Sequence, residues 1–375
     1  MLRICYCLSH YQPIASGAEL QAHRQGVELV RRGHSVHVIT RVVPARPAVE
    51  EIDGVVVHRL IRPIELGPLF GLSFVATLGC ALKRLRGEFD LVHCHQGLWE
   101  AAAAGLVLPR IGKPGVVQPA AGGEFGEVRQ LARARGRSLL RRLILRNQHF
   151  VAISQQIDRE LTELGVPPDR RTRIASGVDT TEFSPGPTPI DRELPPRPRV
   201  LFLGRLHAQK NLPVLLDAWP DVRRHVAATL LLAGEGPERA ALQNHAARLG
   251  VADSVQFLGA VERPIEYLRA ADVVVLPSVA EGMSNSLLEA MAAACPVAVS
   301  RIGGNTDLVD DRRTGMLADP ASAATWSAAI LELLANPDRA RELGVAARAL
   351  VMSQFSIEQV VSRYVELYER LLAEH

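Results

Sequence analysis

The stretch DVVVLPSVAEGMSNSLLEA, residues 272–290, passes from an apolar run through a loop of small residues into a series of good helix formers. The run at 272–277 predicts a buried strand, and residues 286–294 predict a helix capped by Ser284 or Asn285. A strand followed by a helix is the unit from which parallel sheets are built. The segment therefore indicates an α/β fold.

The same alternation of short apolar runs and helical patterns recurs along the chain in two series. The first series has candidate strands at 3–10, 35–40, 55–60, 91–96, 115–118 and 150–154. The second has them at 199–204, 229–234, 254–259, 272–277 and 296–300. Two doubly wound, Rossmann-like domains follow, and such folds bind ligands at the carboxyl ends of their strands, here across a central cleft.

A proline-rich segment separates the two series. SPGPTPIDRELPPRPR (184–199) contains six prolines, which cannot sustain a helix or a central strand. We therefore expect a domain at 1–185, a linker at 186–198 and a second domain at 199–355. The amphipathic pattern at 356–375 predicts a terminal helix that could pack on either domain.

Composition is ordinary for a soluble globular protein, with 47% apolar and 22% charged residues. The five cysteines contain no C-x-x-C pair, and no signal peptide is recognisable, so a reducing cytoplasm is expected. The uncharged run 66–82 contains three glycines and a proline and only touches the lower length of a membrane span. We interpret it as a buried loop and helix.

Positive charge is concentrated in the first half of the chain, where residues 1–185 hold 24 Lys and Arg against 17 Asp and Glu. Seven arginines lie within 129–146, which we predict to be one helix. Such a helix is either a solvated face or a surface that attracts anionic lipid head groups or an anionic acceptor. Nucleic acid is disfavoured, because aromatic residues make up only 5% and no stacking pattern accompanies the arginines.

Two carboxylates, Glu281 and Glu289, flank the predicted start of the helix after 272–277. Gly282 lets the backbone approach a ligand closely. The free N–H groups at the helix start would form an anion site, and they belong to Met283, Ser284, Asn285 and Ser286. This arrangement suits a phosphate with hydroxyls on either side, as in a nucleotide-sugar. A surface acid and an exposed helical Glu explain the pair equally well when it is taken alone.

Two cations follow another strand end. In FLGRLHAQKN (202–211) the strand ends at Gly204, and Arg205 and Lys210 stand five positions apart in the loop and first turn. Both can converge on one diphosphate and neutralise a departing nucleoside diphosphate without a metal. Two ordinary surface cations are the alternative.

The first strand leads through Ser16-Gly17-Ala18 into a helix, where Gly17 would let a phosphate or sugar ring approach the backbone, unless it is a packing glycine. Gly303, Gly304 and Asn305 form a further turn after a strand. His93 and His95 share one face of a strand. Without further ligands at metal spacing, a structural or acceptor-site role is favoured for them over metal binding.

Taken together, the order SGAE, GVDTTEF, GRLHAQKN, GEGP, EGMSNSLLEA and GGNTDLV resembles the retaining GT-B glycosyltransferases of family 4, over nearly the whole chain. The resemblance implies a nucleotide-sugar donor held by the second domain, an acceptor held by the first, and no divalent metal. It implies that Glu281 contacts sugar hydroxyls, Glu289 the ribose, and Arg205, Lys210 and Gly17 the phosphates. The terminal helix would cross back onto the first domain.

Three positions depart from the family pattern. Ser16 replaces the first glycine of a G-G-A-E turn, and Ser176 replaces the Asn of N-G-V-D. The His that many relatives carry after the fifth strand is missing from 113–127. The acceptor side would then be arranged by a set of other residues, namely His95, Gln118, Gly122, Gly123 and Glu124.

The function expected from these residues is retaining transfer of a hexose from a nucleoside diphosphate-sugar, with UDP-sugars favoured, to a saccharide or lipid-linked acceptor in glycan or glycolipid biosynthesis. No cofactor is expected. A non-hydrolysing sugar-nucleotide 2-epimerase and a nucleotide-sugar-binding protein without transfer activity are the alternatives. A dehydrogenase is disfavoured, because no G-x-G-x-x-G follows the first strand. The expected location is the cytoplasm, with contact at the inner face of the membrane through 129–146.

Overall fold

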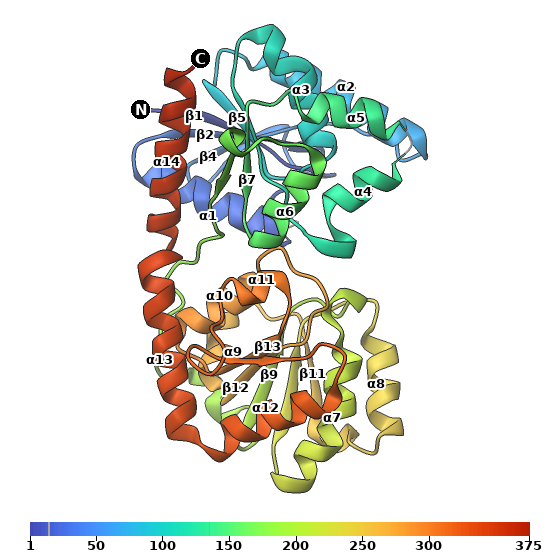
Figure 1. Ribbon diagram of the computed structural model, residues 1–375, viewed down its shortest axis with the longest axis vertical. Helices are drawn as coiled ribbons and strands as arrows, with labels where there is room; N and C mark the ends of the chain where they lie inside the picture. The colour runs from blue at the N-terminus through green and yellow to red at the C-terminus, as the bar shows by residue number, and fades with distance from the viewer. Residues whose placement is uncertain (14–15, 135) are drawn as a thin grey trace. The chain divides into compact units, whose positions relative to one another are not determined.

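The computed structural model describes the chain except for residues 14–15 and 135 and the side chains at 68 and 124. The chain divides into two compact units. The first consists of Met1–Gly177 together with Ile357–His375, and the second is Val178–Ser356 (Figure 1). The division falls eight residues before the boundary expected at 185. Each unit is an α/β domain, as the alternation of strands and helices predicts.

The first unit contains an eight-stranded sheet in the order β3-β4-β2-β1-β5-β6-β7-β8. All neighbouring strands are parallel except β3, which pairs antiparallel with β4. The strands are β1 (Arg3–Cys7), β2 (Ser35–Arg41), β3 (Val49–Ile52), β4 (Val55–Ile61), β5 (Leu91–Cys94), β6 (Gly115–Val117), β7 (His149–Ala152) and β8 (Arg171–Arg173). The central strands are buried throughout, because helices cover a parallel sheet.

Helix α14 (Ile357–Ala373), red in Figure 1, belongs to the core of this first unit. It packs beside α1 (Gly17–Arg31), and its side chains Val360, Tyr364 and Tyr368 join a cluster formed by β1, β2, β4 and β5. A second group of helices contains α2 (Pro68–Arg84), α3 (Trp99–Ile111) and α5 (Arg137–Ile144), in which α3 packs against the other two. Helix α6 (Gln155–Leu164) packs on β7.

The arginine-rich segment 129–146 is two helices, so the prediction of one helix is wrong. Helix α4 (Glu127–Arg133) ends before Gly136, which has a φ of 75° and precedes α5. Glycine adopts this left-handed conformation without the steric cost that other residues meet, and it interrupts the helix. Six of the seven arginines lie in the described part of the chain, and all six are exposed.

The uncharged run 66–82 forms the loop before α2 and most of that helix. The inner face is buried as expected, with Phe74 and Leu78 fully covered. The outer face is not, because Leu66 and Leu72 are 66% and 70% exposed. The prediction of burial is therefore wrong for the start of the run. No helix in the described ranges is long and apolar enough to cross a membrane.

The second unit has an all-parallel six-stranded sheet in the order β11-β10-β9-β12-β13-β14. Its strands are β9 (Arg199–Leu203), β10 (Thr229–Ala233), β11 (Val255–Gly259), β12 (Val273–Leu276), β13 (Val297–Ser300) and β14 (Met316–Ala318). Its helices are α7 (Leu212–His225), α8 (Arg239–Arg248), α9 (Pro264–Ala270), α10 (Asn285–Ala292), α11 (Gly303–Thr306), α12 (Ala323–Ala335) and α13 (Pro337–Gln354).

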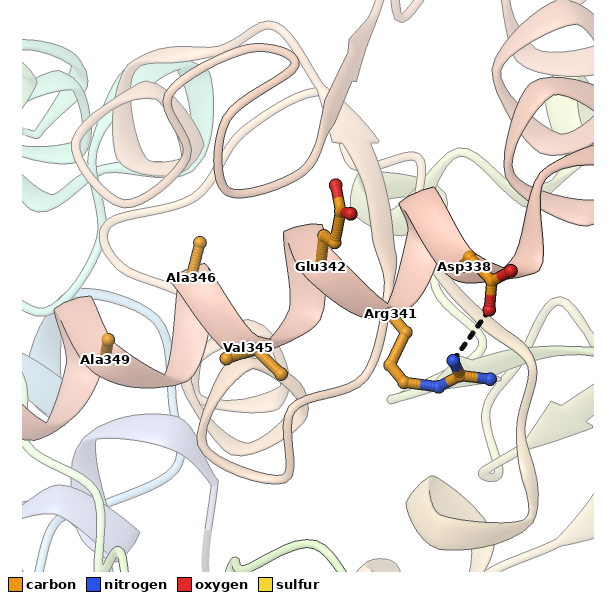
Figure 2. A pocket seen from close by; sticks show the side chains of 6 residues that line it. All are labelled: Asp338, Arg341, Glu342, Val345, Ala346 and Ala349. Carbon is orange, nitrogen blue, oxygen red and sulfur yellow. Dashed lines mark hydrogen bonds and ion pairs between the residues drawn. The ribbon is translucent and has the colours of Figure 1, made fainter.

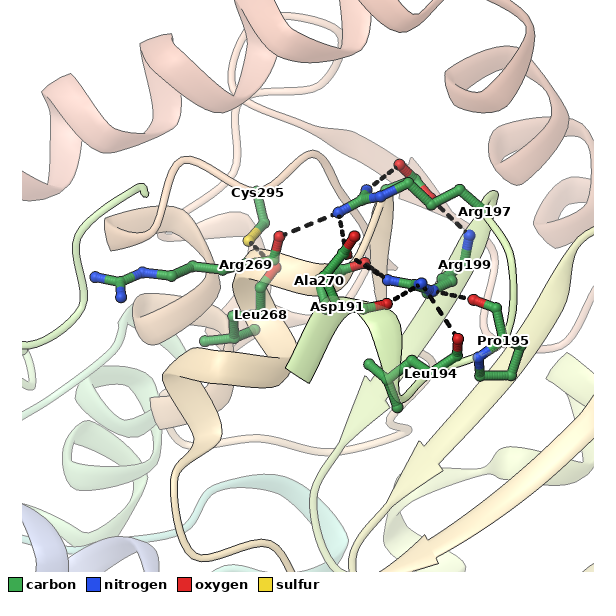
Figure 3. Close-up of polar contacts among 10 residues, drawn as sticks. Asp191, Leu194, Pro195, Arg197, Arg199, Leu268, Arg269, Ala270 and Cys295 are labelled. Atoms are coloured by element: carbon green, nitrogen blue, oxygen red, sulfur yellow. Dashed lines mark hydrogen bonds and ion pairs between the residues drawn. The ribbon is translucent and has the colours of Figure 1, made fainter. Parts of the chain in front are cut away.

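The proline-rich segment expected to link the domains is packed into the second unit (Figure 3). The buried guanidinium of Arg199 binds Asp191 at 2.7 Å, and Arg197 binds Asp272 at 2.5 Å. Arg199 also donates to the carbonyl groups of Asp191 and Pro195. Apart from one 3-10 turn, Pro189–Arg192, the segment from 184 to 198 has no helix or strand, and the arginines fix its backbone to the second unit. The chain passes between the units at 177–178 and 356–357 instead.

Candidate functional site

Three loops converge at the carboxyl ends of β9, β12 and β13 in the second unit. Gln209, after β9, donates its side-chain amide to the carbonyl of Ala280 at 2.8 Å, and its own carbonyl accepts from Val279 at 2.9 Å. The turn after β13 is equally close, because a Cβ on Gly304 would lie 2.6 Å from the carbonyl oxygen of Gly282. The loops at 204–211, 277–284 and 301–306 therefore form one polar cluster.

The centre of this cluster is an ion pair between Lys210 and Glu281. Lys210 Nζ lies 2.5 Å from Glu281 Oε1, and the same oxygen accepts a hydrogen bond of 2.6 Å from the buried hydroxyl of Ser278. The Lys210 side chain is 17% exposed and that of Glu281 is 9% exposed, so water is largely excluded. The low dielectric of such a place strengthens electrostatic contacts with any charged ligand.

Arg205 stands in the same loop as Lys210 but differs from it in environment. Its side chain is exposed, and its guanidinium has no hydrogen-bond or ion-pair partner among the residues that the structure describes. The backbone around it is fixed, since Leu206 N–H donates to Glu235 at 2.9 Å. Gly234 and Gly236 allow this contact, because a Cβ on either would overlap the carbonyl of Gly204 or Leu206. The GEGP turn is therefore a packing element beside β9.

Helix α10 begins beside the ion pair. Ser284 is its N-cap, and its hydroxyl accepts a hydrogen bond of 3.3 Å from Leu287 N–H. The first N–H groups, those of Asn285 and Ser286, belong to residues that are half-buried. Glu289 lies one turn further along and is 5% exposed. The structure thus places both carboxylates of the predicted motif at a buried helix start.

Gly17 lies in the first unit, where it is the first residue of α1. Ser16 is the N-cap, and Glu19 accepts hydrogen bonds from both the Ser16 backbone N–H, at 3.0 Å, and the Ser16 hydroxyl. A glycine at 16 would lack the second of these bonds. The serine at position 16 therefore stabilises the start of α1. Gly17, the next residue, is exposed.

The acceptor-side candidates His95 and Gln118 are buried in a polar cluster beneath α14. His93 Nδ1 lies 2.7 Å from the Tyr368 hydroxyl, and Tyr364 donates to Gln118 Oε1 at 2.6 Å. His95 stacks on His93 with ring centroids 4.1 Å apart and is 1% exposed. Burial lowers the pKa of His93 to about 3 and that of His95 well below its usual value, so both rings are neutral.

The remaining acceptor-side candidates lie in the loop after β6. Gly122 is buried, and Gly123, with a φ of 71°, donates its N–H to Glu160 at 2.6 Å. Glu127 accepts hydrogen bonds of 2.9 and 3.0 Å from Ala120 and Ala121, which fixes the same loop. The side chain of Glu124 lies outside the described residues.

The sequence analysis missed a buried carboxylate in the first unit, that of Glu100, which lies near the end of β1. Ser9, directly after β1, donates from its hydroxyl to Glu100 Oε1 at 2.5 Å, and its N–H donates to Gln96 at 3.2 Å. Burial raises the pKa of Glu100 to about 7, and the hydrogen bond from Ser9 opposes this shift. Glu100 is the one charged residue in the alanine-rich stretch WEAAAAG (99–105). A single acid in an otherwise small and apolar helix is the sequence signal that could have identified it.

Neither the surface of α13 nor the acidic, histidine and cysteine side chains of the described residues provide another site. A depression on the outer face of α13 is lined by residues of that helix alone, among them Val345 and the ion-paired Asp338 and Arg341, 2.8 Å apart (Figure 2). Among the described residues, no polar side chain of another element lines it. Across the described ranges, no group of three or more His, Cys, Asp and Glu side chains is arranged to hold a metal ion.

Comparison with known proteins adds to this geometry. Residues 15–182 match the model described as Glycosyltransferase Family 4, and residues 197–336 match Glycosyl transferases group 1. The chain is 31% identical to a D-inositol 3-phosphate glycosyltransferase of Nocardia farcinica, with 99% of this chain and 90% of the relative aligned. The chain belongs to the group 1 glycosyltransferases.

Another relative of this glycosyltransferase is the GDP-mannose-dependent alpha-(1-6)-phosphatidylinositol monomannoside mannosyltransferase of Mycolicibacterium smegmatis, which is 31% identical over 91% of each chain. Among solved structures, sucrose-phosphate synthase of Thermosynechococcus elongatus superposes with a TM-score of 0.85 at 24% identity over 99% of each chain. Anabaena HepE, solved with UDP and glucose, superposes with a TM-score of 0.81 at 20% identity, covering 98% of this chain and 100% of HepE. The glycosyltransferase therefore has the GT-B fold.

Proposed function

We propose that this glycosyltransferase moves a hexose from a nucleoside diphosphate-sugar to a saccharide or lipid-linked acceptor with retention of anomeric configuration. The observation that carries the proposal is the Lys210–Glu281 ion pair, held at 2.5 Å in a polar loop cluster beside the exposed Arg205. A half-buried cation in the same loop as an unpaired, exposed one, at the carboxyl ends of parallel strands, suits a diphosphate.

The ion pair also suggests how the site responds to a donor. Without a donor, Glu281 neutralises Lys210, and Ser278 holds the carboxylate in place. A diphosphate would offer Lys210 a second anionic partner, and the negative charge that grows on the leaving phosphate would strengthen that contact in the transition state. Glu281 would then accept hydrogen bonds from hydroxyls of the transferred sugar.

The other donor contacts are proposed on the same basis. The N–H groups at the start of α10, from Met283 to Ser286, would bind phosphate, and Glu289 would bind the ribose hydroxyls. Gly204 and Gly282 let the backbone come close to the ligand, and Gly17 would contribute from the first unit. Retention would proceed by attack on the same face of the sugar, assisted by the leaving phosphate, so no protein nucleophile and no metal are assigned.

Relatives narrow the choice of donor and acceptor without deciding it. The mannosyltransferase relative is named for GDP-mannose and a phosphatidylinositol mannoside, whereas HepE was solved with UDP and glucose. We retain UDP-sugars as the first donors to test and GDP-mannose as the second. On the acceptor side, His95, Gln118 and Gly122 are buried, so we propose that they support the surrounding structure, and that Gly123 and Glu124 are nearer to the acceptor.

The test is a screen of UDP-, GDP- and ADP-sugars with the purified full chain, in the presence and absence of a metal chelator. Expected results are thermal stabilisation by one nucleotide class, slow release of nucleoside diphosphate that the chelator leaves unchanged, and product of retained configuration by NMR. A changed donor sugar without any acceptor would indicate an epimerase. Binding of nucleotide with neither hydrolysis nor transfer to any acceptor offered would indicate a binding protein.

A further inference from the structure

The outer face of α2 and the loop before it present large apolar side chains to solvent. Ile64, Leu66, Leu69 and Leu72 are 48%, 66%, 49% and 70% exposed. Exposed apolar residues are common singly, but four within nine positions form a patch that is rare on a soluble surface without a function. The helix carries no charged side chain before Lys83.

This patch is held rigidly in place. On the inner side, Gly71 lies against the Trp99 ring so closely that a Cβ would overlap it, and Phe70 packs edge-on to the same ring at 6.4 Å. Ser73 Oγ accepts from the N–H of Ile64 at 2.8 Å and fixes the loop to the first turns of the helix. With Phe70, Gly71 and Phe74 committed to the core, Leu69 and Leu72 must point outward.

Positive charge accompanies the patch in the same group of helices. Helix α3 packs against both α2 and α5. The segment 128–146 contains no acidic residue, and its six described arginines are exposed together with Leu139, which is 62% exposed. The acid nearest to the leucines in sequence, Glu65, is already paired with Arg41.

We propose that the outward leucines of 64–72 and the arginines of α4 and α5 form a docking surface for an anionic bilayer, with the leucines entering the boundary of the acyl chains. Arginines alone give a reversible, salt-sensitive attraction, and a few leucines alone give a weak one. The two together meet the requirement for stable peripheral binding. A lipid-linked acceptor, which is part of the proposed function, would lie in the same bilayer.

The experiment measures co-sedimentation of the full chain with vesicles of phosphatidylcholine, alone or mixed with phosphatidylglycerol, over a range of salt concentrations. The variants are Leu69→Gln with Leu72→Gln, and Arg142→Gln with Arg146→Gln. The matched control is Val345→Gln with Met352→Gln, which changes two exposed apolar residues on α13 in the second unit. All six side chains are on the surface, so the variants should fold normally.

We expect the affinity of the leucine variant for the mixed vesicles to fall about tenfold or more at every salt concentration. The arginine variant should lose the salt-sensitive part of the binding. The control variant should bind like the wild type. Equal binding of the leucine variant and the wild type would overturn the proposal. The proposal would also be overturned if the wild type bound vesicles equally well with and without phosphatidylglycerol. It would be overturned as well if light scattering showed that the leucine substitutions convert a dimer into a monomer and leave vesicle binding unchanged. Donor binding is measured separately, so failure of the proposed function is distinguishable from failure here.

Discussion

Polar side chains gather near strand ends in both units, but the two clusters differ in what covers them. In the second unit, the half-buried Lys210 pairs with the buried Glu281, and the exposed Arg205 lies in the same loop as Lys210. In the first unit, His93 and His95 are fully covered, and Tyr368 of α14 binds the first of them. The comparison shows that a polar cluster near the strand ends of a parallel sheet can lie under a helix, as in the first unit, or among loops, as in the second.

The largest effect is expected from removing the charge of Lys210 in the cluster of the second unit. Lys210→Met should lower the rate of nucleoside diphosphate release with the donor from the screen by about 10²–10³-fold, because the charge that develops on the leaving phosphate loses its partner. Steady-state kinetics would measure this loss. Lys113→Met, which removes a lysine of the first unit, is the control, and an equal loss in both variants would show that Lys210 has no special part.

A second prediction concerns the acid of the first unit that sequence reasoning missed. The pKa of Glu100 is about 7 in the folded protein, above its ordinary value of 4.5, so the folded state holds a proton that the unfolded chain releases between these values. Stability from this group is present below pH 4.5 and is lost as the pH rises through 7, by at most about 3 kcal/mol.

Glu100→Gln keeps a partner for the Ser9 hydroxyl and removes the titration. The free energy of unfolding, measured by urea denaturation, should therefore fall less between pH 5 and pH 8 than it does in the wild type. Ser9→Ala retains the titrating carboxyl and should retain the pH dependence. A wild type whose stability is flat over this range would contradict the assignment.

An effect of similar size, on the acid side, is expected in the covered cluster. Burial holds the pKa of His95 well below its usual 6.5, so the unfolded chain gains a proton on acidification that the folded chain cannot. Stability is present above that value and is lost as the pH falls, by about 1.4 kcal/mol for each pH unit below it. His95→Phe fills the same space between Tyr6 and His93 without titrating, and its unfolding free energy should decline less steeply from pH 6 to pH 4. The exposed His225→Phe should decline like the wild type.

Sequence patterns predicted the buried strands, because central strands of a parallel sheet are continuous apolar runs such as VVVL at 273–276. Short edge strands escaped notice. β8 is RTR and β3 is VEEI, and neither carries an apolar run, because edge strands are half exposed. Proline content predicted a segment before Arg199 without an α-helix or a central strand, and the structure has there only a 3-10 turn at Pro189–Arg192. Proline content could not show that this segment packs into the second unit, because the contacts depend on where the arginine side chains reach.

The sequence predicted which residues would form the candidate site, but not which of them would contact one another. Spacing placed Arg205, Lys210 and Glu281 in loops after strands and Glu289 one turn inside a helix, where the structure has them. The contact between Lys210 and Glu281 joins residues 71 positions apart and depends on the order of strands in the sheet. Burial of His95 was equally hidden, because the tyrosines that cover its neighbour come from the last helix.

The chain leaves the first unit after residue 177 and returns to it at residue 357, so this unit is completed after the second one during synthesis. The second unit is complete once residue 356 has left the ribosome, whereas the core of the first unit still lacks Val360, Tyr364 and Tyr368. The part of the protein that is made first is thus finished last. Until α14 has been made, the apolar face of β1 and α1 on which it packs stays open, and this nascent surface is one that a chaperone would have to protect.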